Sequence, residues 1–261
     1  MKRLILISLS VLSLCSCSIL SQIQWNPEGL ASAAGKTITA ASINDQQIVA
    51  LCQQTVVSLD QQNVLAANDY QKRLQRLLGG VEEIDGIPVN YKVYKTEEIN
   101  AFASGDGSIR VYSGLMDIMD DQELVAIIGH ELGHVVHQDT KKALKNAYIA
   151  SAARDVVGSA GSYGALIANL LGDLGEALVS AQFSQSQEYK ADLYGYEFAI
   201  DKGYSPHSME KALIKLLTKS GSGSSNIMTH LFASHPQTEK RIEKVRKAAE
   251  EYEARLAKVS Q

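Results

Sequence analysis

The pentapeptide His130-Glu131-Leu132-Gly133-His134 limits the possible structures of this chain more than any other feature. At roughly 100° per residue, two histidines four positions apart lie about 40° apart on one face of a helix, so their imidazoles can converge on one metal ion. Glu131 then projects beside that ion, where a general base for a bound water belongs. The pattern is the signature of zinc-dependent hydrolases. The alternative is a helix that carries two histidines by chance.

The sequence around the pentapeptide favours a buried helix. Asp120 and Glu123 form an Asp-x-x-Glu capping box ahead of it. The positions that follow are too apolar for a surface helix: Leu124, Val125, Ile127, Ile128, Leu132, Val135 and Val136. Histidines and a glutamate inside such a helix need partners, because unpaired buried polar groups are costly. We therefore expect a helix over about 121–137 that carries a metal site.

A third ligand is needed, since catalytic zinc usually takes three protein ligands and a water. Glu188 and Asp192 are four residues apart and share one face of a predicted helix over 185–201. Glu188 is the candidate ligand, while Asp192 can accept the second ring N–H of a ligand histidine and fix its orientation. The alternative is a solvated charged face with Lys190 and Glu197.

His137 is the rival ligand, because it lies near the angle of the two motif histidines but one turn further along. The three-histidine pattern also requires a glycine and another histidine downstream, which Gln138-Asp139-Thr140 does not supply. We interpret His137 as a residue of the surface or of the surroundings of the site.

The N-terminus predicts an exported, lipid-anchored protein. Met1-Lys2-Arg3 precedes a short apolar run that ends in Leu14-Cys15-Ser16-Cys17. Such a start is a secretory signal, too short for an ordinary membrane span. The cysteines resemble a bacterial lipobox. We expect cleavage before Cys17 and lipid attachment there, because bulky Leu14 precedes Cys15; acyl chains would anchor the domain to a membrane leaflet. The alternative is an ordinary signal peptide with incidental cysteines.

Removal of the signal changes the formal charge from −4 to about −6, which argues against a nucleic-acid partner. Cys52 is then the one cysteine of the folded domain, so an internal disulfide is impossible. It falls on an apolar helical stripe and is expected to be a small buried hydrophobe.

We predict four regions: a lipoprotein signal peptide (1–16), a flexible tether (17–40), a metal-binding domain (41–245) and a charged C-terminal helical tail (246–261). The tether is rich in Ser, Gly, Ala and Gln. Further helices are expected at about 44–60 and 68–78, and strands at 88–94, 101–103 and 109–112, the last two joined by a Gly-Asp-Gly turn. One modest sheet and many helices indicate an α+β fold.

The second half of the domain is less regular in sequence. Residues 141–182 are rich in Ala, Gly and Leu, with helical spacing over 166–179 and a candidate mobile insertion around 158–164. Residues 219–225 read as a flexible loop, and Pro236 then opens a long charged helix, since proline is accepted in a first turn.

Several short motifs together resemble one family. They are the pentapeptide, Glu188 with Asp192, Asn100-Ala101-Phe102-Ala103, and Ser234-His235-Pro236 with Arg241-Ile242. In this order and spacing they are similar to the HtpX and CAAX-prenyl-protease type of zinc metallopeptidase, over about 90–242. The lipobox makes the chain most similar to the soluble periplasmic lipoprotein branch. One departure is Gln185, where family members often have arginine.

The resemblance implies a mainly helical zincin fold of the gluzincin type, with a small sheet whose edge strand borders the active-site cleft. It implies one Zn²⁺ per chain, held by His130, His134 and Glu188, with Glu131 as the catalytic base. Residues Asn100, Ala101, Phe102 and Ala103 would bind substrate backbone by strand addition. His235 would lie near the metal, as an oxyanion donor or as a fourth ligand; the alternative is a neighbour of the helix start without a catalytic part.

The implied function is a zinc metalloendopeptidase that degrades unfolded or misassembled envelope proteins in quality control. Ser18 after the lipidated cysteine implies the periplasmic face of the outer membrane. Expected partners are damaged envelope polypeptides, the membrane through the N-terminal lipid, and the envelope assembly machinery. Two alternatives are a lipoprotein chaperone or assembly factor on a protease fold, and a zinc hydrolase of cell-wall peptides.

Overall fold

The computed structural model describes residues 43–67, 69–158, 163–221, 234–236 and 239–259. The predicted signal peptide, the predicted tether and Cys17 lie outside these residues, as do positions 159–162 of the candidate insertion. Most of the predicted loop at 219–225 also lies outside them, but its first three residues belong to a helix. Among the described residues, no helix combines the length and apolarity that a membrane crossing needs.

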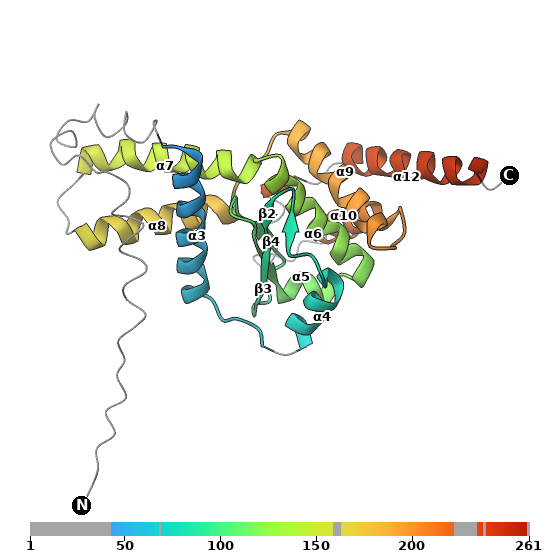
Figure 1. Ribbon diagram of the computed structural model, residues 1–261, viewed down its shortest axis with the longest axis horizontal. Coiled ribbons are helices and arrows are strands. Elements are labelled where there is room, and N and C mark those ends of the chain that lie inside the picture. Colours follow the sequence, from blue (N-terminus) through green and yellow to red (C-terminus); the bar gives the residue numbers. More distant parts are fainter. Residues whose placement is uncertain (1–42, 68, 159–162, 222–233, 237–238, 260–261) are drawn as a thin grey trace, which may run out of the picture.

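A three-stranded sheet forms the centre of the molecule (Figure 1). Its order is β3-β5-β4, from β3 (Asn90–Tyr94), β5 (Ser108–Tyr112) and β4 (Ala101–Ala103). Strand β3 runs parallel to β5. Strand β4 pairs antiparallel with β5, and these two strands form the predicted hairpin. The turn requires Gly107, whose φ is +85°, and a Cβ there would lie 2.0 Å from the Pro88 carbonyl oxygen.

A small hairpin precedes this sheet. It consists of β1 (Glu83–Ile84) and β2 (Ile87–Pro88), which pair antiparallel. The predicted strand over 88–94 is therefore two strands that are interrupted at Val89, whose N–H donates to the Glu82 carbonyl at 2.8 Å.

Helix α6 (Asp121–Val136) carries the pentapeptide and is buried along most of its length. It begins at the predicted capping box of Asp120 and Glu123. It packs along α9 (Gln185–Asp201), and glycines bring the two helices close together. A Cβ at Gly195 would lie 2.4 Å from the Ala126 carbonyl oxygen. This close contact places the polar residues of both helices side by side.

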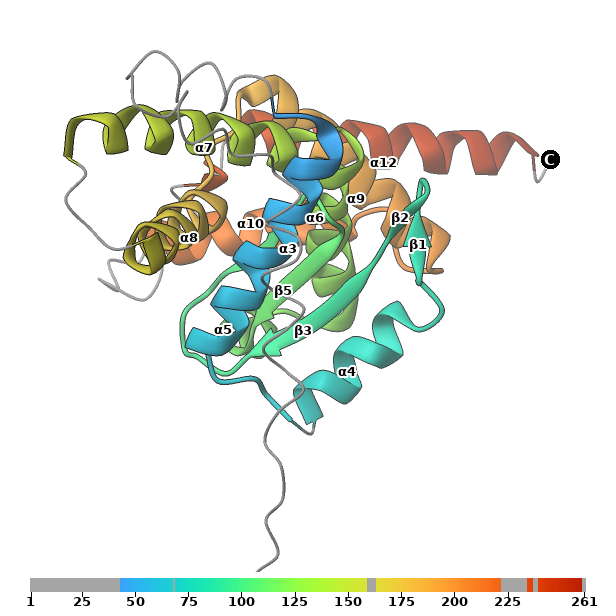
Figure 2. The same cartoon turned by 60° about the vertical axis from the view of Figure 1, so that its left-hand side comes forward.

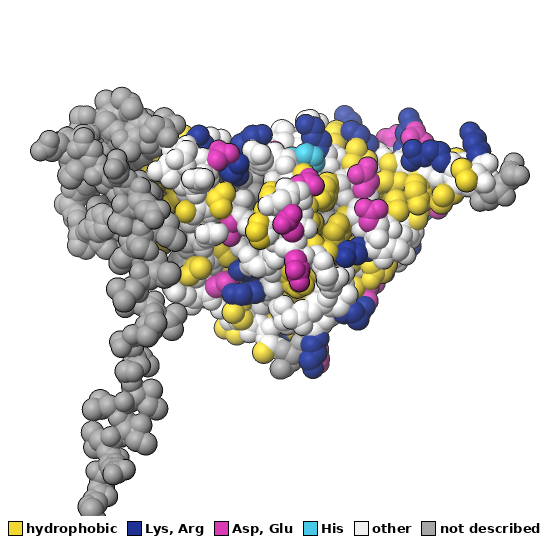
Figure 3. Space-filling view, in the orientation of Figure 1, with side chains coloured by type: hydrophobic (Ala, Val, Ile, Leu, Met, Phe, Trp, Pro, Cys, Tyr) yellow, Lys and Arg dark blue, Asp and Glu magenta, His cyan; other side chains and the backbone are white. Residues whose placement is uncertain are grey.

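The main core lies between this helix pair, one face of the sheet, and α10 (Ser208–Gly221). Helices α4 (Asp69–Leu78) and α5 (Ser113–Ile118) add to it. Helix α12 (Glu239–Val259) packs against α9 and α10 with its first half, and its last turns project from the body (Figure 1). Its exposed surface carries interspersed acidic and basic side chains (Figure 3).

A second core covers the other face of the sheet. It is formed by α3 (Asp45–Gln62), α7 (Asp139–Gly158) and α8 (Tyr163–Val179), which lie together at one end of the molecule (Figure 2). Cys52 is buried in it and forms no disulfide. The buried Arg110 of β5 pairs with Asp60 of α3 at 2.7 Å and ties this helix to the sheet.

The fold is α+β and mainly helical, as predicted. Helix α9 has the predicted bounds, and α3, α4, α6, β4 and β5 agree within two residues. The sequence analysis did not identify α5, α10 or the β1–β2 hairpin. The C-terminal helix is assigned from Glu239, so Pro236 precedes its first described turn, and the helix continues across our predicted domain boundary at residue 245.

Candidate metal centre

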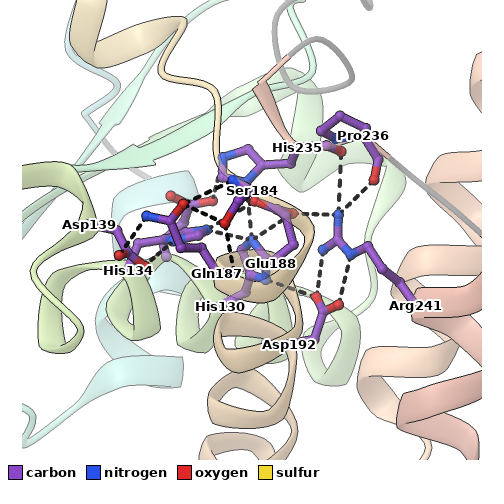
Figure 4. A network of polar contacts seen from close by, with 11 residues as sticks. His130, His134, Asp139, Ser184, Gln187, Glu188, Asp192, His235, Pro236 and Arg241 are labelled. Carbon is purple, nitrogen blue, oxygen red and sulfur yellow. Dashed lines mark hydrogen bonds and ion pairs between the residues drawn. The ribbon is translucent and has the colours of Figure 1, made fainter. Parts of the chain in front are cut away.

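Four buried side chains converge between α6, α9 and the segment before α12 (Figure 4). They are His130, His134, Glu188 and His235, and one ligand atom from each lies within 4.8 Å of all the others. The structure thus brings the three predicted ligands together with the histidine that resemblance alone had placed near them. Among the described residues, no other cluster of His, Cys, Asp and Glu has this arrangement.

Both motif histidines are oriented by carboxylates. The Nδ1 atom of His130 lies 3.0 Å from Asp192 Oδ1, and that of His134 lies 3.2 Å from Asp139 Oδ2. Because an ionised carboxylate only accepts, each ring donates from Nδ1, and each neutral ring presents a lone pair at Nε2. These two Nε2 atoms face each other at 3.2 Å. Two lone pairs at this distance repel, so the arrangement needs a cation between the rings, which is either a proton on one Nε2 or a metal ion.

The donor set fits zinc. Two imidazole nitrogens and a carboxylate are a common ligand set of catalytic zinc sites. The pKa of Glu188 lies well below its usual range. Burial raises this pKa, but hydrogen bonds from His134 and His235 contribute to lowering it by more than burial raises it. Burial also lowers the pKa of His134, yet its bonds to Asp139 and Glu188 raise it overall to about 9. These surroundings favour a positive charge at the centre of the cluster.

Asp192 has the predicted position and a partner that the sequence analysis did not foresee. Besides bonding His130, its carboxylate accepts two bonds from the guanidinium of Arg241, at 2.7 Å from Nε and 2.5 Å from Nη2 (Figure 4). From the sequence, Arg241 was identified only as part of a motif, without a role of its own. Its position shows that the first turns of α12 belong to the site.

Asp139 is a second residue whose role was missed. It stands five positions after His134, at the start of α7. Its other oxygen accepts from Gln187 at 2.7 Å, and Gln187 also forms the capping box of α9 with Ser184. A chain of polar contacts therefore runs from His134 to the beginning of the helix that carries Glu188 (Figure 4). No signal in the sequence pairs residue 139 with residue 187.

Two aromatic contacts complete the surroundings. Phe183 stacks on His134, with ring centroids 3.9 Å apart and planes inclined by 17°. His137 caps the end of α6 and lies edge-on to Tyr194, with ring centroids 6.3 Å apart. His137 is not a member of the four-residue cluster, so the rival three-histidine arrangement is absent among the described residues.

Glu131 lies beside the cluster with an unsatisfied oxygen. Its carboxylate is buried, and Oε1 has no hydrogen-bond partner among the described residues; the nearest ring atom is His235 Nε2 at 3.6 Å. Burial raises the pKa of Glu131, and the backbone N–H of Ala103 partly offsets this rise. A buried carboxylate oxygen without a partner is costly, and a water would satisfy it.

A small, partly open cavity of about 10 Å³ lies next to Glu131, which is about the room that one water needs. Its lining combines polar and apolar side chains: Ile127, His130, Glu131, Leu213, Leu216, His235 and Arg241.

The predicted edge strand reaches Glu131. The Asn100 carbonyl accepts from the Tyr112 N–H at 3.0 Å, and the Ser104 N–H donates to the Ser108 carbonyl at 2.8 Å. In an antiparallel ladder such pairs alternate, so the main-chain groups of Ala101 and Ala103 point to the other side, away from β5. The Ala101 N–H donates to Asn100 Oδ1 at 2.9 Å, and the Ala103 N–H lies close enough to the Glu131 carboxyl to lower its pKa.

This fold, with two histidines and a glutamate converging beside a second buried glutamate, is the arrangement of a metal-dependent peptidase. Comparison with known proteins agrees. The sequence model described as Peptidase family M48 matches residues 65–249, and the chain belongs to this family. It is a zinc metalloprotease.

Two similar relatives span nearly the whole chain. The present chain is 38% identical to Metalloprotease LoiP of Escherichia coli (strain K12) over 249 residues, which cover 94% of this chain and 95% of LoiP. It is 32% identical to Metalloprotease YcaL of the same organism over 250 residues, which cover 94% and 96%. A Protease HtpX homolog of Pyrococcus abyssi is 30% identical over 188 residues, which cover 58% of this chain and 64% of that protein.

Proposed function

We propose that this protein is an endopeptidase that hydrolyses unfolded or misassembled polypeptides at one zinc ion held by His130, His134 and Glu188. The observation that carries the proposal is the pair of Nε2 atoms that face each other at 3.2 Å, next to the buried and unsatisfied Oε1 of Glu131. One cation and one water would satisfy all of these atoms, and together they are what peptide hydrolysis requires.

Zinc, when bound, polarises a water and lowers its pKa toward neutrality. Glu131 takes the proton from the attacking water and delivers it to the leaving amine. Its burial supports this role, because a raised pKa makes the carboxylate a better proton acceptor. Asp192 and Asp139 keep the Nδ1 protons of the two histidines in place, so that both Nε2 atoms stay available as ligands.

His235 has two candidate roles. Its Nδ1 lies 3.2 Å from His130 Nε2 and 3.0 Å from Glu188 Oε1, within the group of ligand atoms. This position suits a fourth ligand that occupies the space a water and a substrate carbonyl need. After a small displacement, the same ring could instead donate to the oxyanion of the tetrahedral intermediate.

The edge strand supports an extended substrate. Ala101 and Ala103 present their main-chain groups on the side of β4 that does not pair with β5, and Ala103 lies against the catalytic base. A substrate strand added there would bring its backbone next to Glu131. Strand addition needs an unfolded or loosened chain, so we propose a role in protein quality control.

The place of action is part of the proposal. Cleavage before Cys17 and lipid attachment there would hold the enzyme on the periplasmic face of the outer membrane, beside misassembled envelope proteins and their assembly machinery. The N-terminal sequence Leu14-Cys15-Ser16-Cys17 supports this location.

The central test compares the purified protein with its Glu131→Gln variant on casein, with zinc supplied. We expect the variant to retain stoichiometric zinc and to lose at least about a hundredfold in cleavage rate, since general-base catalysis contributes on that order. Full cleavage by Glu131→Gln would refute the mechanism. Cleavage of peptidoglycan peptides but not of casein would favour the cell-wall hydrolase, and full complementation of a deletion by Glu131→Gln would favour the chaperone.

A further inference from the structure

Among the described residues, Arg241 is the one arginine or lysine buried within the site, and it contacts two of the site's carboxylates. Its side chain is 3% exposed and lies in the first described turn of α12. Two of its nitrogens bond Asp192, as described above. The third, Nη1, lies 2.6 Å from Oε2 of Glu188. The planar guanidinium thus joins the carboxylate that orients His130 to the carboxylate that is the proposed third ligand.

The contact with Arg241 distinguishes the two oxygens of Glu188. Oε2 lies against Arg241 and 3.8 Å from His130 Nε2, whereas Oε1 lies 3.3 Å from His134 Nε2 and 3.0 Å from His235 Nδ1. Without Arg241, Oε2 would lose its nearest charged contact and could turn toward the imidazoles.

The same nitrogen also holds the main chain that carries His235. Nη1 lies 3.1 Å from the Pro236 carbonyl oxygen and 3.5 Å from that of His235 (Figure 4). A single side chain therefore fixes a ligand carboxylate, the partner of a ligand histidine, and the backbone beside the fourth member of the cluster.

We propose that Arg241 is a positioning residue of the metal site: it directs one oxygen of Glu188 toward the histidine nitrogens and ties α12 to the centre. The inference rests on the proposed role of Glu188 as a ligand. Lysine cannot replace Arg241, because an ammonium is a compact charge, whereas contacts to Asp192, Glu188 and the backbone together need the planar fork. Groups that orient metal ligands typically change metal affinity by 10–100-fold.

The test measures zinc affinity by competition with a chelator, together with the visible spectrum of the cobalt-substituted protein. Arg241→Lys keeps the charge and removes the fork, and we expect zinc binding to weaken by about 10–100-fold, with a changed cobalt spectrum. The matched control is Arg246→Lys on the same helix, where an arginine bonds Glu210 at the surface. We expect this control to bind zinc like the original protein.

An Arg241→Lys protein with unchanged zinc affinity and an unchanged cobalt spectrum overturns the inference, even if its melting temperature falls, because Arg241 would then only stabilise the fold. If Arg241→Lys does not fold, the double variant Arg241→Met, Asp192→Asn is compared with Asp192→Asn alone. Equal zinc affinities in that pair also overturn the inference. Failure of the proposed function is seen separately, as full casein cleavage by Glu131→Gln.

Discussion

At the scale of residues, the site depends on how each histidine is held rather than on the histidines alone. Asp192 and Asp139 fix the Nδ1 side of the two rings, and so decide that the Nε2 atoms point at each other. Asp192 is in turn held by Arg241, and Asp139 by Gln187. Two neutral rings in this arrangement would repel each other at Nε2, so the pair is suited to hold a cation, and the raised pKa of His134, about 9, favours a proton there when no metal ion is bound.

Asp139 is therefore expected to matter for metal binding although it is not a ligand. In Asp139→Asn the negative charge that raises the basicity of His134 is lost, and we expect zinc affinity to fall by about tenfold or more. Chelator competition measures the change. Asp45→Asn is the control, since Asp45 is exposed and bonds Lys141 rather than any residue of the four-residue cluster. Equal zinc affinities in the two variants would contradict the role of Asp139.

The two candidate roles of His235 make opposite predictions. Because its ring lies among the ligand atoms in this structure, we expect His235→Ala to bind zinc more weakly and, at saturating zinc, to cleave casein faster. A fall of about 100-fold or more in kcat with an unchanged KM would instead identify an oxyanion donor. His207→Ala serves as the control, since His207 bonds Glu210 at the surface and should affect neither quantity.

Sequence reasoning found the residues of this site whose positions follow from helix geometry. His130 with His134, and Glu188 with Asp192, are pairs four apart on one helix. The roles of Asp139 and Arg241 were not predicted, because they depend on how α7 and α12 pack against the other helices. Spacing within one helix does not show how helices pack against each other.

At the scale of elements, the contact between α6 and α9 sets the distance between the ligands. Gly129, Gly133 and Gly195 lie in this contact, and a Cβ on any of them would come within 3.0 Å of the opposite helix. The two ligands on α6 and the one on α9 can converge only because these positions lack side chains.

Gly195→Ala should disturb both stability and metal binding. The added methyl would meet the Ala126 carbonyl oxygen at 2.4 Å, and overpacking of this kind costs about 1–3 kcal/mol. We expect a lower melting temperature of the metal-free protein and weaker zinc binding. Gly172→Ala in α8 is the control. Nothing lies within 4 Å of the position that the alanine Cβ would take, so the change should stabilise the helix by roughly 0.5–1 kcal/mol. A Gly195→Ala protein as stable as the original would refute the argument.

Elements with clear start signals were predicted well. Helices α6 and α9 both begin with capping boxes, at Asp120 and Ser184, and their starts agree with the expectation. Helix α5 has only six residues, too few for a helical period to be recognised. Helix α10 ends in Lys219-Ser220-Gly221, which reads as a loop, and its buried apolar residues, Met209, Ala212, Leu213 and Leu216, all precede that end.

At the scale of the whole molecule, the site lies where three separate parts of the chain meet. Helix α6 supplies His130, His134 and the proposed base Glu131, α9 supplies Glu188, and the segment before α12 supplies His235. The sheet adds Ala103, whose backbone lowers the pKa of Glu131. Sequence reasoning predicted the fold class, but not which part covers which face, because that depends on packing between residues distant in the chain.

The proposed anchoring is a property of the complete chain and can be tested apart from catalysis. In cells, Cys17→Ser should move the protein from the membrane fraction to the soluble fraction, because the acylated residue is lost. Immunoblots of the fractions measure this. Casein cleavage by the purified variant should be unchanged. Cys15→Ser is the control and should remain with membranes. If Cys15→Ser is released and Cys17→Ser is not, the assignment of the lipidated cysteine is wrong.

The hydrogen bonds at the edge of β4 also bear on aggregation. An open strand edge can pair with the same edge of a second copy, and such pairing leads to insoluble assemblies. Here the outward N–H group of Ala101 already donates to the Asn100 side chain at 2.9 Å. Any incoming strand, whether a substrate or a second copy, must displace this acceptor before it can pair there. The Asn100 side chain therefore makes the edge less open to self-association at the same place where we propose that a substrate strand binds.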